Sequence, residues 1–222
     1  MKSIFIAGTD TGIGKTTVSA ILLKQFNAKG CKTVGLKPVA SGSNDDALML
    51  QAAASIFCPL KTINPIALRE PIAPHLAAAK MKINLTKKLL IEKILLSIKN
   101  DVDIHIIEGA GGWSVPLNER ELYSEAIIDL NMPVILVVGL RLGCLNHAIL
   151  TYQNMLQMNT RLVGWIANCM DPDMLEINSN IDTLKQWIKR PCLGIVKNNQ
   201  YQEAKIDIDS IQKFLFQQSD VT

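Results

Sequence analysis

The fold is decided at residues 8–17, which read Gly8-Thr9-Asp10-Thr11-Gly12-Ile13-Gly14-Lys15-Thr16-Thr17. An apolar run, residues 3–7, comes directly before this stretch, and a helical pattern, residues 15–29, comes directly after it. Gly12 and Gly14 let the backbone curl so that its N–H groups point into the turn. The stretch therefore predicts a strand, a curled turn with free backbone amides, and a helix, in that order.

The same stretch is a modified form of a phosphate-binding loop. The Walker A pattern places four residues between its first glycine and the Gly-Lys pair, whereas five, residues 9–13, follow Gly8 here. Loop amides and the positive end of the following helix bind phosphate oxygens. A turn without a ligand is the weaker alternative, because strand, loop, Gly-Lys-Thr and helix occur in order. We expect a nucleoside triphosphate with Mg²⁺ on Gly12, Ile13, Gly14, Lys15, Thr16 and Thr17, with Lys15 on the β- and γ-phosphates and Thr16 on the metal.

Strand and helix patterns alternate along the rest of the chain. The predicted strands are residues 3–7, 33–37, 104–108, 134–139, 162–168 and 192–196, and the predicted helices are residues 15–29, 45–57, 86–99, 145–158 and 174–188. Most strands are continuously apolar, as in sheets covered on both faces. This predicts a doubly wound α/β fold of the P-loop NTPase kind, with a mainly parallel sheet and helices on both faces.

Two segments depart from the alternation. Residues 59–82 contain four prolines and predict an ordered excursion with a short helix at residues 75–79, and residues 206–216 are amphipathic. No linker or repeat divides the chain, and 222 residues suit one domain, so we expect a single P-loop domain over residues 1–222.

Composition narrows the class of protein. The chain has 48% apolar and 19% charged residues and a net charge of +3, which excludes a disordered chain. There is no basic stripe of the kind that nucleic-acid binding needs, and no Cys-x-x-Cys pair. The longest apolar run, residues 134–140, is far shorter than the roughly 20 residues that span a bilayer. We expect a cytoplasmic protein with neither membrane nor nucleic-acid partners.

Ligands of such sheets bind at the carboxyl ends of the strands, so residues that follow strands carry the function. Lys37 ends the second predicted strand and can neutralise an anionic substrate group, although a solvated lysine is the simpler alternative. Ser41 offers a hydroxyl next to Gly42. Glu108 ends the third predicted strand, and a surface or capping carboxylate is its alternative role.

An oxygen-only site for Mg²⁺ follows from these strand ends. Thr16, Glu108 and an aspartate from Asp45-Asp46 supply a hydroxyl and two carboxylates, which suits Mg²⁺ bound with several waters. One aspartate could instead cap the helix that begins there. The glycine-rich residues 109–112 after Glu108 permit close backbone contact with a ligand.

Several longer motifs now identify a resemblance. They are Lys-Pro-Val-Ala-Ser-Gly (37–42), Asn-Pro (64–65), Glu-Pro-Ile-Ala-Pro-His (70–75), Glu-Gly-Ala-Gly-Gly-Trp (108–113), Pro-Val-Ile-Leu-Val-Val-Gly (133–139), Leu-Gly-Cys-Leu-Asn-His-Ala (142–148) and Gly-Trp-Ile-Ala-Asn (164–168). With the phosphate loop, this set resembles the dethiobiotin synthetase family over most of residues 3–196.

The resemblance implies closure of the ureido ring of dethiobiotin from 7,8-diaminononanoate, CO₂ and ATP. It implies a homodimer that meets through residues 143–146 and the following helix. By motif, it places Thr16, Asp46 and Glu108 on Mg²⁺ and Ser41 on the diamine or its carbamate. It also implies three catalytic residues, Lys37, Lys15 and Thr11, and nucleotide contacts from Gly109, Ala110, Gly111 and Asn168, the last of these on adenine.

Three departures from the family pattern leave questions open. Gly12 is often Glu in the family, and the loop at residues 43–46 is shorter than in many members. Asp46 is preferred over Asp45 because it directly precedes Ala47-Leu48, as in the family motif. Residues 197–199 stand where a Pro-x-Leu motif for adenine is expected, so the base preference stays open.

The alternative of a different class is a nucleotide-driven switch or partition-type ATPase. Such proteins usually carry an extra lysine early in the phosphate loop, and residues 9–11 contain none. Of the histidines, His105 lies in an apolar strand and predicts a core position, and His147 predicts local packing. His75 is balanced between a substrate-side and a structural position.

Overall fold

The structure is a computed structural model and describes residues 2–198, 201 and 203–216. The strands are β1 (Lys2–Gly8), β2 (Thr33–Leu36), β3 (Val39–Ser41), β4 (Ile66–Leu68), β5 (Ile104–Glu108), β6 (Val134–Leu140), β7 (Leu162–Cys169) and β8 (Cys192–Val196). The helices are α1 (Lys15–Ala28), α2 (Asp45–Ala53), α3 (Leu60–Ile63), α4 (Pro74–Lys80), α5 (Lys87–Ser97), α6 (Tyr123–Asp129), α7 (Cys144–Gln157), α8 (Ile177–Trp187) and α9 (Ile208–Phe216).

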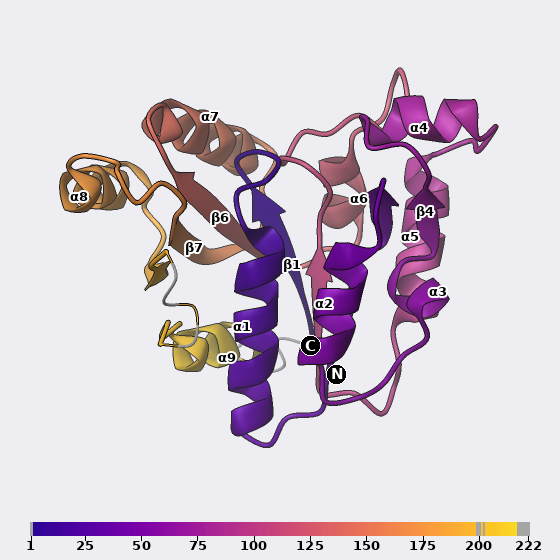
Figure 1. The fold of residues 1–222 in the computed structure, drawn as a ribbon, viewed down its shortest axis with the longest axis horizontal. Coiled ribbons are helices and arrows are strands. Elements are labelled where there is room, and N and C mark those ends of the chain that lie inside the picture. Colours follow the sequence, from indigo (N-terminus) through magenta and orange to yellow (C-terminus); the bar gives the residue numbers. More distant parts are fainter. Residues whose placement is uncertain (1, 199–200, 202, 217–222) are drawn as a thin grey trace.

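Six strands form one parallel sheet in the order β2-β5-β1-β6-β7-β8. The predicted parallel sheet is therefore confirmed. The chain leaves β1 toward β2 on one side and later returns to β6 on the other, so the order reverses at β1 (Figure 1). Ligands of open α/β sheets bind at such a reversal. The phosphate loop follows β1 at this point.

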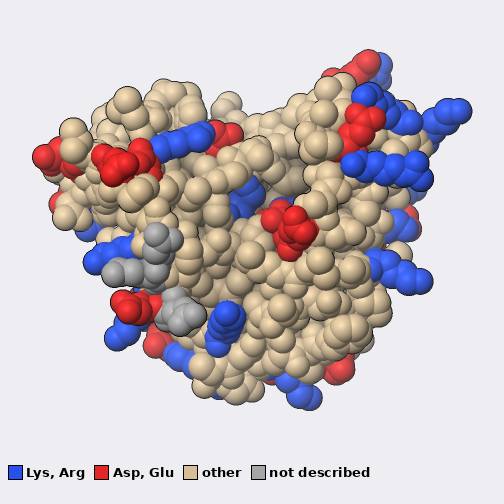
Figure 2. Space-filling view, viewed as in Figure 1, with Lys and Arg blue, Asp and Glu red and all other residues tan. Residues whose placement is uncertain are grey.

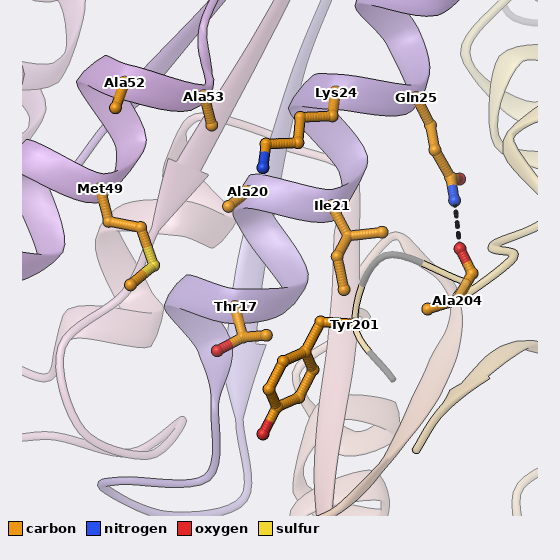
Figure 3. Close-up of a pocket in the computed structure, with 10 residues that line it drawn as sticks. All are labelled: Thr17, Ala20, Ile21, Lys24, Gln25, Met49, Ala52, Ala53, Tyr201 and Ala204. Carbon is orange, nitrogen blue, oxygen red and sulfur yellow. Dashed lines mark hydrogen bonds between the residues drawn. The ribbon is translucent and has the colours of Figure 1, made fainter. Parts of the chain in front are cut away.

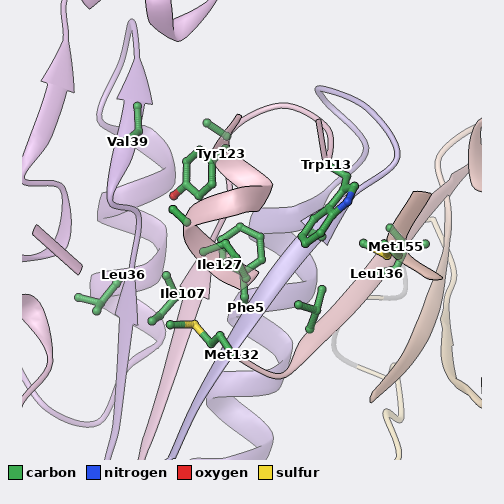
Figure 4. Close-up of a cluster of buried hydrophobic side chains, with 14 of the residues drawn as sticks. Phe5, Leu36, Val39, Ile107, Trp113, Tyr123, Ile127, Met132, Leu136 and Met155 are labelled. Atoms are coloured by element: carbon green, nitrogen blue, oxygen red, sulfur yellow. The ribbon is translucent and has the colours of Figure 1, made fainter. Parts of the chain in front are cut away.

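The sheet is covered on both faces, because side chains of successive strand residues point to opposite faces. Ile4 and Ile6 pack with α1, α2 and α9, whereas Phe5 packs on the other face with α6. Figure 4 shows Phe5 among Trp113, Tyr123 and other buried side chains of that second face. The rings of Phe5 and Tyr123 lie 5.6 Å apart between centroids. Both faces are thus apolar, as the continuous apolar strands predict.

The structure corrects several predicted boundaries. The second strand ends at Leu36, one residue before Lys37, because Pro38 has no N–H with which to continue a ladder. The helix predicted over residues 45–57 ends at Ala53, and the one predicted over residues 174–188 begins at Ile177.

The proline-rich excursion is more ordered than the sequence indicates. In addition to the predicted short helix, now α4, it contains α3 and β4, and β4 pairs with β3 in a second, two-stranded parallel sheet. Ile66 N–H donates to the carbonyl of Pro38, which starts this pairing. The excursion therefore folds back on the segment that carries Ser41.

The amphipathic C-terminal segment forms α9, which packs against α1. Ile208, Ile211 and Leu215 are buried there, at the spacing that the amphipathic pattern predicts. Lys29, directly after α1, pairs with Asp209 of α9 at the exposed edge. Within the described ranges, no helix has the length and apolar character that a membrane crossing requires.

Candidate active site

The phosphate loop curls between β1 and α1 as its glycines predict. Gly12 and Gly14 have φ angles of +67° and +81°, in the left-handed region that favours glycine. The Gly14 carbonyl accepts the first helical hydrogen bond, from Val18 at 3.0 Å, so α1 begins directly after the loop. The positive end of α1 thus faces the loop interior, where phosphate oxygens are stabilised.

Lys15 is buried at the floor of the loop, and its ammonium donates to the carbonyl of Asp10 at 2.9 Å. Burial and, to a smaller extent, the nearby Lys37 lower the pKa of Lys15 to about 8, against the opposing effect of Glu108 and Asp46. A carbonyl is a weaker partner than a phosphate anion. The ammonium therefore gains stabilisation when an anion takes the place of that carbonyl.

A second buried cluster joins residues far apart in sequence. The Lys37 ammonium donates to Glu108 Oε1 at 2.5 Å and lies 2.8 Å from Asp46 Oδ2. The Thr16 hydroxyl donates to the same Glu108 oxygen at 2.8 Å. The structure thus brings together the three predicted metal ligands and the predicted catalytic lysine. Asp45 is exposed at the start of α2, so the structure places Asp46 rather than Asp45 beside Lys37.

The charges in this cluster stabilise one another. Burial alone would lower the pKa of Lys37, but Glu108 and Asp46 outweigh it, so that pKa is raised. Burial opposes ionisation of Asp46, yet Lys37 and a hydrogen bond from Thr16 hold its pKa below the ordinary value. Both Lys37 and Asp46 are therefore charged at neutral pH.

The donor set fits the implied Mg²⁺. Glu108 is fully buried, and its Oε2 has no hydrogen-bond partner among the described residues. A buried carboxylate oxygen without a partner is costly unless a ligand or metal completes it. Asp46 and Thr16 line the same cavity as Glu108, so the cluster offers the hard oxygen ligands that Mg²⁺ prefers.

A cavity of about 810 Å³ lies above this cluster. Figure 2 shows it as a hollow with a basic side chain in its depth and acidic side chains at its edge. The predicted residues on its wall are Thr11, Gly12, Gly14, Lys15, Thr16, Thr17, Lys37, Ser41, Asp46, Glu108, Ala110 and Gly111. The Ser41 hydroxyl is buried and finds no hydrogen-bond partner within the described part of the chain, so it is free for a ligand.

The opposite wall comes from residues 71–74, which belong to one of the resemblance motifs but were not assigned a ligand contact from the sequence. Pro71, Ile72, Ala73 and Pro74, from the excursion before α4, line the cavity. Gly42 packs against Pro71 with a φ of +93°, and a Cβ there would lie 3.0 Å from the proline ring. The Pro-x-x-Pro spacing is the one sequence signal for this rigid wall.

The residues predicted to contact the nucleotide differ in where they lie relative to the cavity. Ile13 is buried below the loop, and Gly109 lies behind the cavity with its carbonyl accepting from Lys37 at 3.2 Å. The loop after Gly109 is held by Trp113, whose Nε1–H donates to Asn154 of α7 at 3.0 Å. Ala110 and Gly111 reach the cavity itself.

Asn168 supports the phosphate loop from β7. Its Nδ2 donates to the carbonyl of Ile13 at 2.8 Å, and its Oδ1 is buried without a hydrogen-bond partner in the described ranges. Next to it, Asn198 donates to the carbonyl of Met170 at 3.3 Å. Of residues 197–199, which stand where the family's adenine motif is expected, Asn199 lies outside the described residues.

A second cavity, of about 510 Å³, adjoins the first along α1 and shares Thr17 and Met49 with it. Figure 3 shows its lining from α1 and α2 on one side and from Tyr201 and Ala204 on the other. Gln25 of α1 donates to the Ala204 carbonyl at 2.6 Å and fixes that side.

Arg141 is a further charged residue at the site. It follows β6 and pairs with the carboxylate of Asp10, whose other oxygen accepts from the Thr11 amide at 2.7 Å. In the sequence, its position shortly after a predicted strand is the feature that indicates a role near the site.

The three histidines occupy different environments in the structure. His105 is buried, its Nε2 accepts from Lys99 N–H at 3.1 Å, and burial lowers its pKa to about 4, so the predicted core position is confirmed. His147 is exposed on α7. His75 is half-buried on α4, one residue beyond the cavity wall.

A phosphate loop at the reversal of a parallel sheet, with lysines and carboxylates in one cavity, defines a P-loop protein that acts on nucleoside triphosphates. In agreement, the family model described as an AAA domain matches residues 2–205. An ATP-dependent dethiobiotin synthetase from Cellvibrio japonicus is 44% identical over 203 residues, 88% of this chain and 89% of that protein. One from Nitrosospira multiformis is 42% identical and covers 95% of this chain and 94% of its own. The chain belongs to the dethiobiotin synthetase family.

Solved structures with a similar fold are more distant in sequence. The septum site-determining protein MinD of Pyrococcus horikoshii, complexed with Mg-ADP, has a TM-score of 0.58 at 14% identity and covers 96% of this chain and 93% of its own. The receptor FtsY of Elizabethkingia anophelis, in complex with GDP, has a TM-score of 0.55 at 14% identity, over 97% of this chain and 63% of its own. They share the fold alone, and the predicted fold class is confirmed.

Proposed function

We propose that the chain is an ATP- and Mg²⁺-dependent dethiobiotin synthetase that converts 7,8-diaminononanoate and CO₂ to dethiobiotin, releasing ADP and phosphate. The observation that carries this proposal is the Lys37 ammonium, buried beside the phosphate loop and between two carboxylates in a cavity of about 810 Å³. The identity of 40–44% with dethiobiotin synthetases over most of the chain supports it.

The chemistry has three steps, each with a negatively charged group. One neutral amine of the substrate attacks CO₂ and loses a proton, which gives a carbamate. A carbamate oxygen attacks the γ-phosphorus of ATP and displaces ADP, which gives a carbamic–phosphoric anhydride. The second amine attacks the carbonyl carbon of that anhydride, loses a proton, expels phosphate and closes the ring. Positioning and charge stabilisation suffice for such phosphoryl transfer, so no protein nucleophile is required.

The cavity supplies the groups that these steps need. The loop amides at residues 12–17 and the Lys15 ammonium bind the β- and γ-phosphates. Lys37 stabilises charge on the carbamate and on the transferred phosphoryl group, in a buried site where such interactions are strong. Thr11 and Ser41 line the same cavity and orient the phosphate and the carbamate.

Thr16, Asp46 and Glu108 would hold Mg²⁺ in this arrangement. Mg²⁺ held by these residues would supply positive charge that offsets the negative charge of the triphosphate. Ala110, Gly111 and Asn168 complete the nucleotide side of the proposed site.

A homodimer in the cytoplasm is the proposed setting. Leu142 precedes the N-terminus of α7 with 96% of its surface exposed, and Leu150 of α7 is also exposed. Such side chains suit an interface. Sedimentation velocity of the full chain tests this, and a monomer at micromolar concentration would contradict it.

Product detection tests the reaction. The protein, ATP, Mg²⁺, bicarbonate and 7,8-diaminononanoate should yield dethiobiotin by mass spectrometry, with one phosphate released for each product. The alternative function, a nucleotide-dependent switch or partition-type ATPase, rests on the fold shared with MinD. A rate of ATP hydrolysis that does not depend on the diamine, and that increases on self-association or with DNA, would favour that alternative.

Nucleotide binding should depend on pH through Lys15. Its pKa is about 8 in the free protein, and bound phosphates raise that pKa because they favour the charged form. Binding of a non-hydrolysable ATP analogue at pH 8.5 should therefore be accompanied by proton uptake. The affinity for the analogue should fall as the pH rises further, by at most about tenfold per pH unit. Calorimetry in two buffers of different ionisation enthalpy measures this uptake. Uptake that persists in Lys15→Met would assign it to another group.

The two aspartates at the start of α2 should differ in their effect on Mg²⁺. Asp46→Asn should raise the Mg²⁺ concentration for half-maximal activity by about tenfold or more, because a charged metal ligand is lost. Asp45→Asn is the matched control, since Asp45 is its exposed neighbour, and should leave the requirement unchanged. Magnesium titrations of the dethiobiotin assay measure both. The reverse order of effects would make Asp45 the ligand.

A further inference from the structure

The Lys37 ammonium lies where a cation has oxygen partners on several sides. It is 2.5 Å from Glu108 Oε1, 2.8 Å from Asp46 Oδ2 and 3.2 Å from the carbonyl of Gly109. The Thr16 hydroxyl is bonded to the same Glu108 oxygen. The lysine thus uses the carboxylates that the proposed function assigns to Mg²⁺.

An ammonium and a divalent cation cannot share these carboxylates without strong repulsion. Lys37 and Glu108 are both at most 5% exposed, and like charges in a buried setting repel far more than they do in water. The fully buried Glu108 carboxylate also requires a cationic partner, because a buried charge without one is destabilising. Each cation on this cluster therefore weakens the binding of the other.

We propose that the Lys37 ammonium and the divalent metal are alternative partners of the Asp46 and Glu108 carboxylates. Metal binding releases Lys37 into the cavity, which its side chain already lines. The ammonium is then available to the carbamate only once the metal is in place. This inference rests on the metal site of the proposed function and assigns an order to its loading.

Lys15 offers an internal comparison. It is as buried as Lys37, at 5% exposure, but its ammonium donates to a carbonyl, that of Asp10, rather than to a carboxylate. Lys15 can therefore turn to a phosphate without competing with the metal. Removing either lysine deletes one buried positive charge near the same cluster, but only Lys37 bonds to the carboxylates.

Binding of Mn²⁺ without nucleotide or substrate tests the proposal. Electron paramagnetic resonance should find Mn²⁺ at least about tenfold tighter on Lys37→Met than on the unaltered protein, because the competing charge is gone. Mn²⁺ should also raise the Tm of Lys37→Met more than that of the unaltered protein. Lys15→Met should tighten Mn²⁺ binding less than Lys37→Met does. Equal or weaker Mn²⁺ binding by Lys37→Met would overturn the proposal.

A measurement on the unaltered protein covers the case in which Lys37→Met does not fold. In crystals with Mn²⁺ and a non-hydrolysable ATP analogue, the anomalous signal should lie at Asp46 and Glu108, with the Lys37 ammonium moved off both. An ammonium that still bonds both carboxylates beside the metal overturns the proposal. The proposed function fails separately, when the unaltered protein forms no dethiobiotin.

Discussion

Lys37→Ala should lower the kcat for dethiobiotin formation by about 10²–10³, while the Kd for ATP changes little. Removing one preorganised group that stabilises transition-state charge typically costs this factor, or roughly 3–4 kcal/mol. The lysine is buried and bonded to Glu108 and Asp46 rather than to the phosphate loop, so the loop keeps its own contacts. Steady-state product formation and equilibrium binding of an ATP analogue measure the two quantities.

The control for this variant has to separate chemistry from folding. Lys80→Ala removes a lysine that is exposed and paired with Glu70, and it should leave both quantities unchanged. The Tm of Lys37→Ala shows whether the protein remains folded at the assay temperature, since a buried carboxylate has lost a partner. Unchanged turnover would contradict the catalytic assignment, and an equal loss of ATP affinity would make Lys37 a nucleotide-binding residue instead.

The phosphate loop was predictable because its information is local. Glycines with positive φ, a lysine and a threonine lie next to one another in sequence between a strand and a helix, and the structure keeps that order. The sheet was predictable for a similar reason, since continuous apolar runs require helices on both faces. Boundaries failed where a single residue decides them, as Pro38 does after β2.

The site beyond the loop was predictable only as a neighbourhood. Strand-end logic placed Lys37 and Glu108 at the same edge of the sheet, and β2 and β5 are indeed adjacent. It could not place the Lys37 ammonium within 2.5 Å of Glu108, because side-chain contacts across 71 residues depend on packing. The ion pair of Arg141 with Asp10 depends on a loop whose path the sequence does not determine.

The position of the cavity wall at residues 71–74 also could not be predicted from the sequence. The sequence shows the motif, but the position of these residues depends on the β3–β4 pairing, which brings the proline-rich excursion back over the site. Three-residue strands carry too little periodicity to be recognised. That residues 71–74 line the cavity could therefore be recognised only from the fold.

Gly14→Ala should weaken ATP binding by about 10²-fold, or roughly 2.7 kcal/mol. An alanine at a φ of +81° is strained by about 1–2 kcal/mol. Its Cβ would also lie 2.1 Å from Asn168 Nδ2, so that amide must leave its bond to the Ile13 carbonyl, at a cost of about 1 kcal/mol. Both costs fall on the loop conformation that presents its amides to phosphate. Calorimetric titration with an ATP analogue measures the loss.

Gly12→Ala separates the two causes, because Gly12 has a similar φ of +67° and a Cβ there meets nothing within 4 Å. It should therefore show the backbone strain alone and lose about five- to thirtyfold in affinity. Adding Asn168→Ala to Gly14→Ala should recover part of the loss, since it removes the clash. Equal losses for Gly12→Ala and Gly14→Ala would mean that Asn168 yields freely and that backbone strain alone governs the loop.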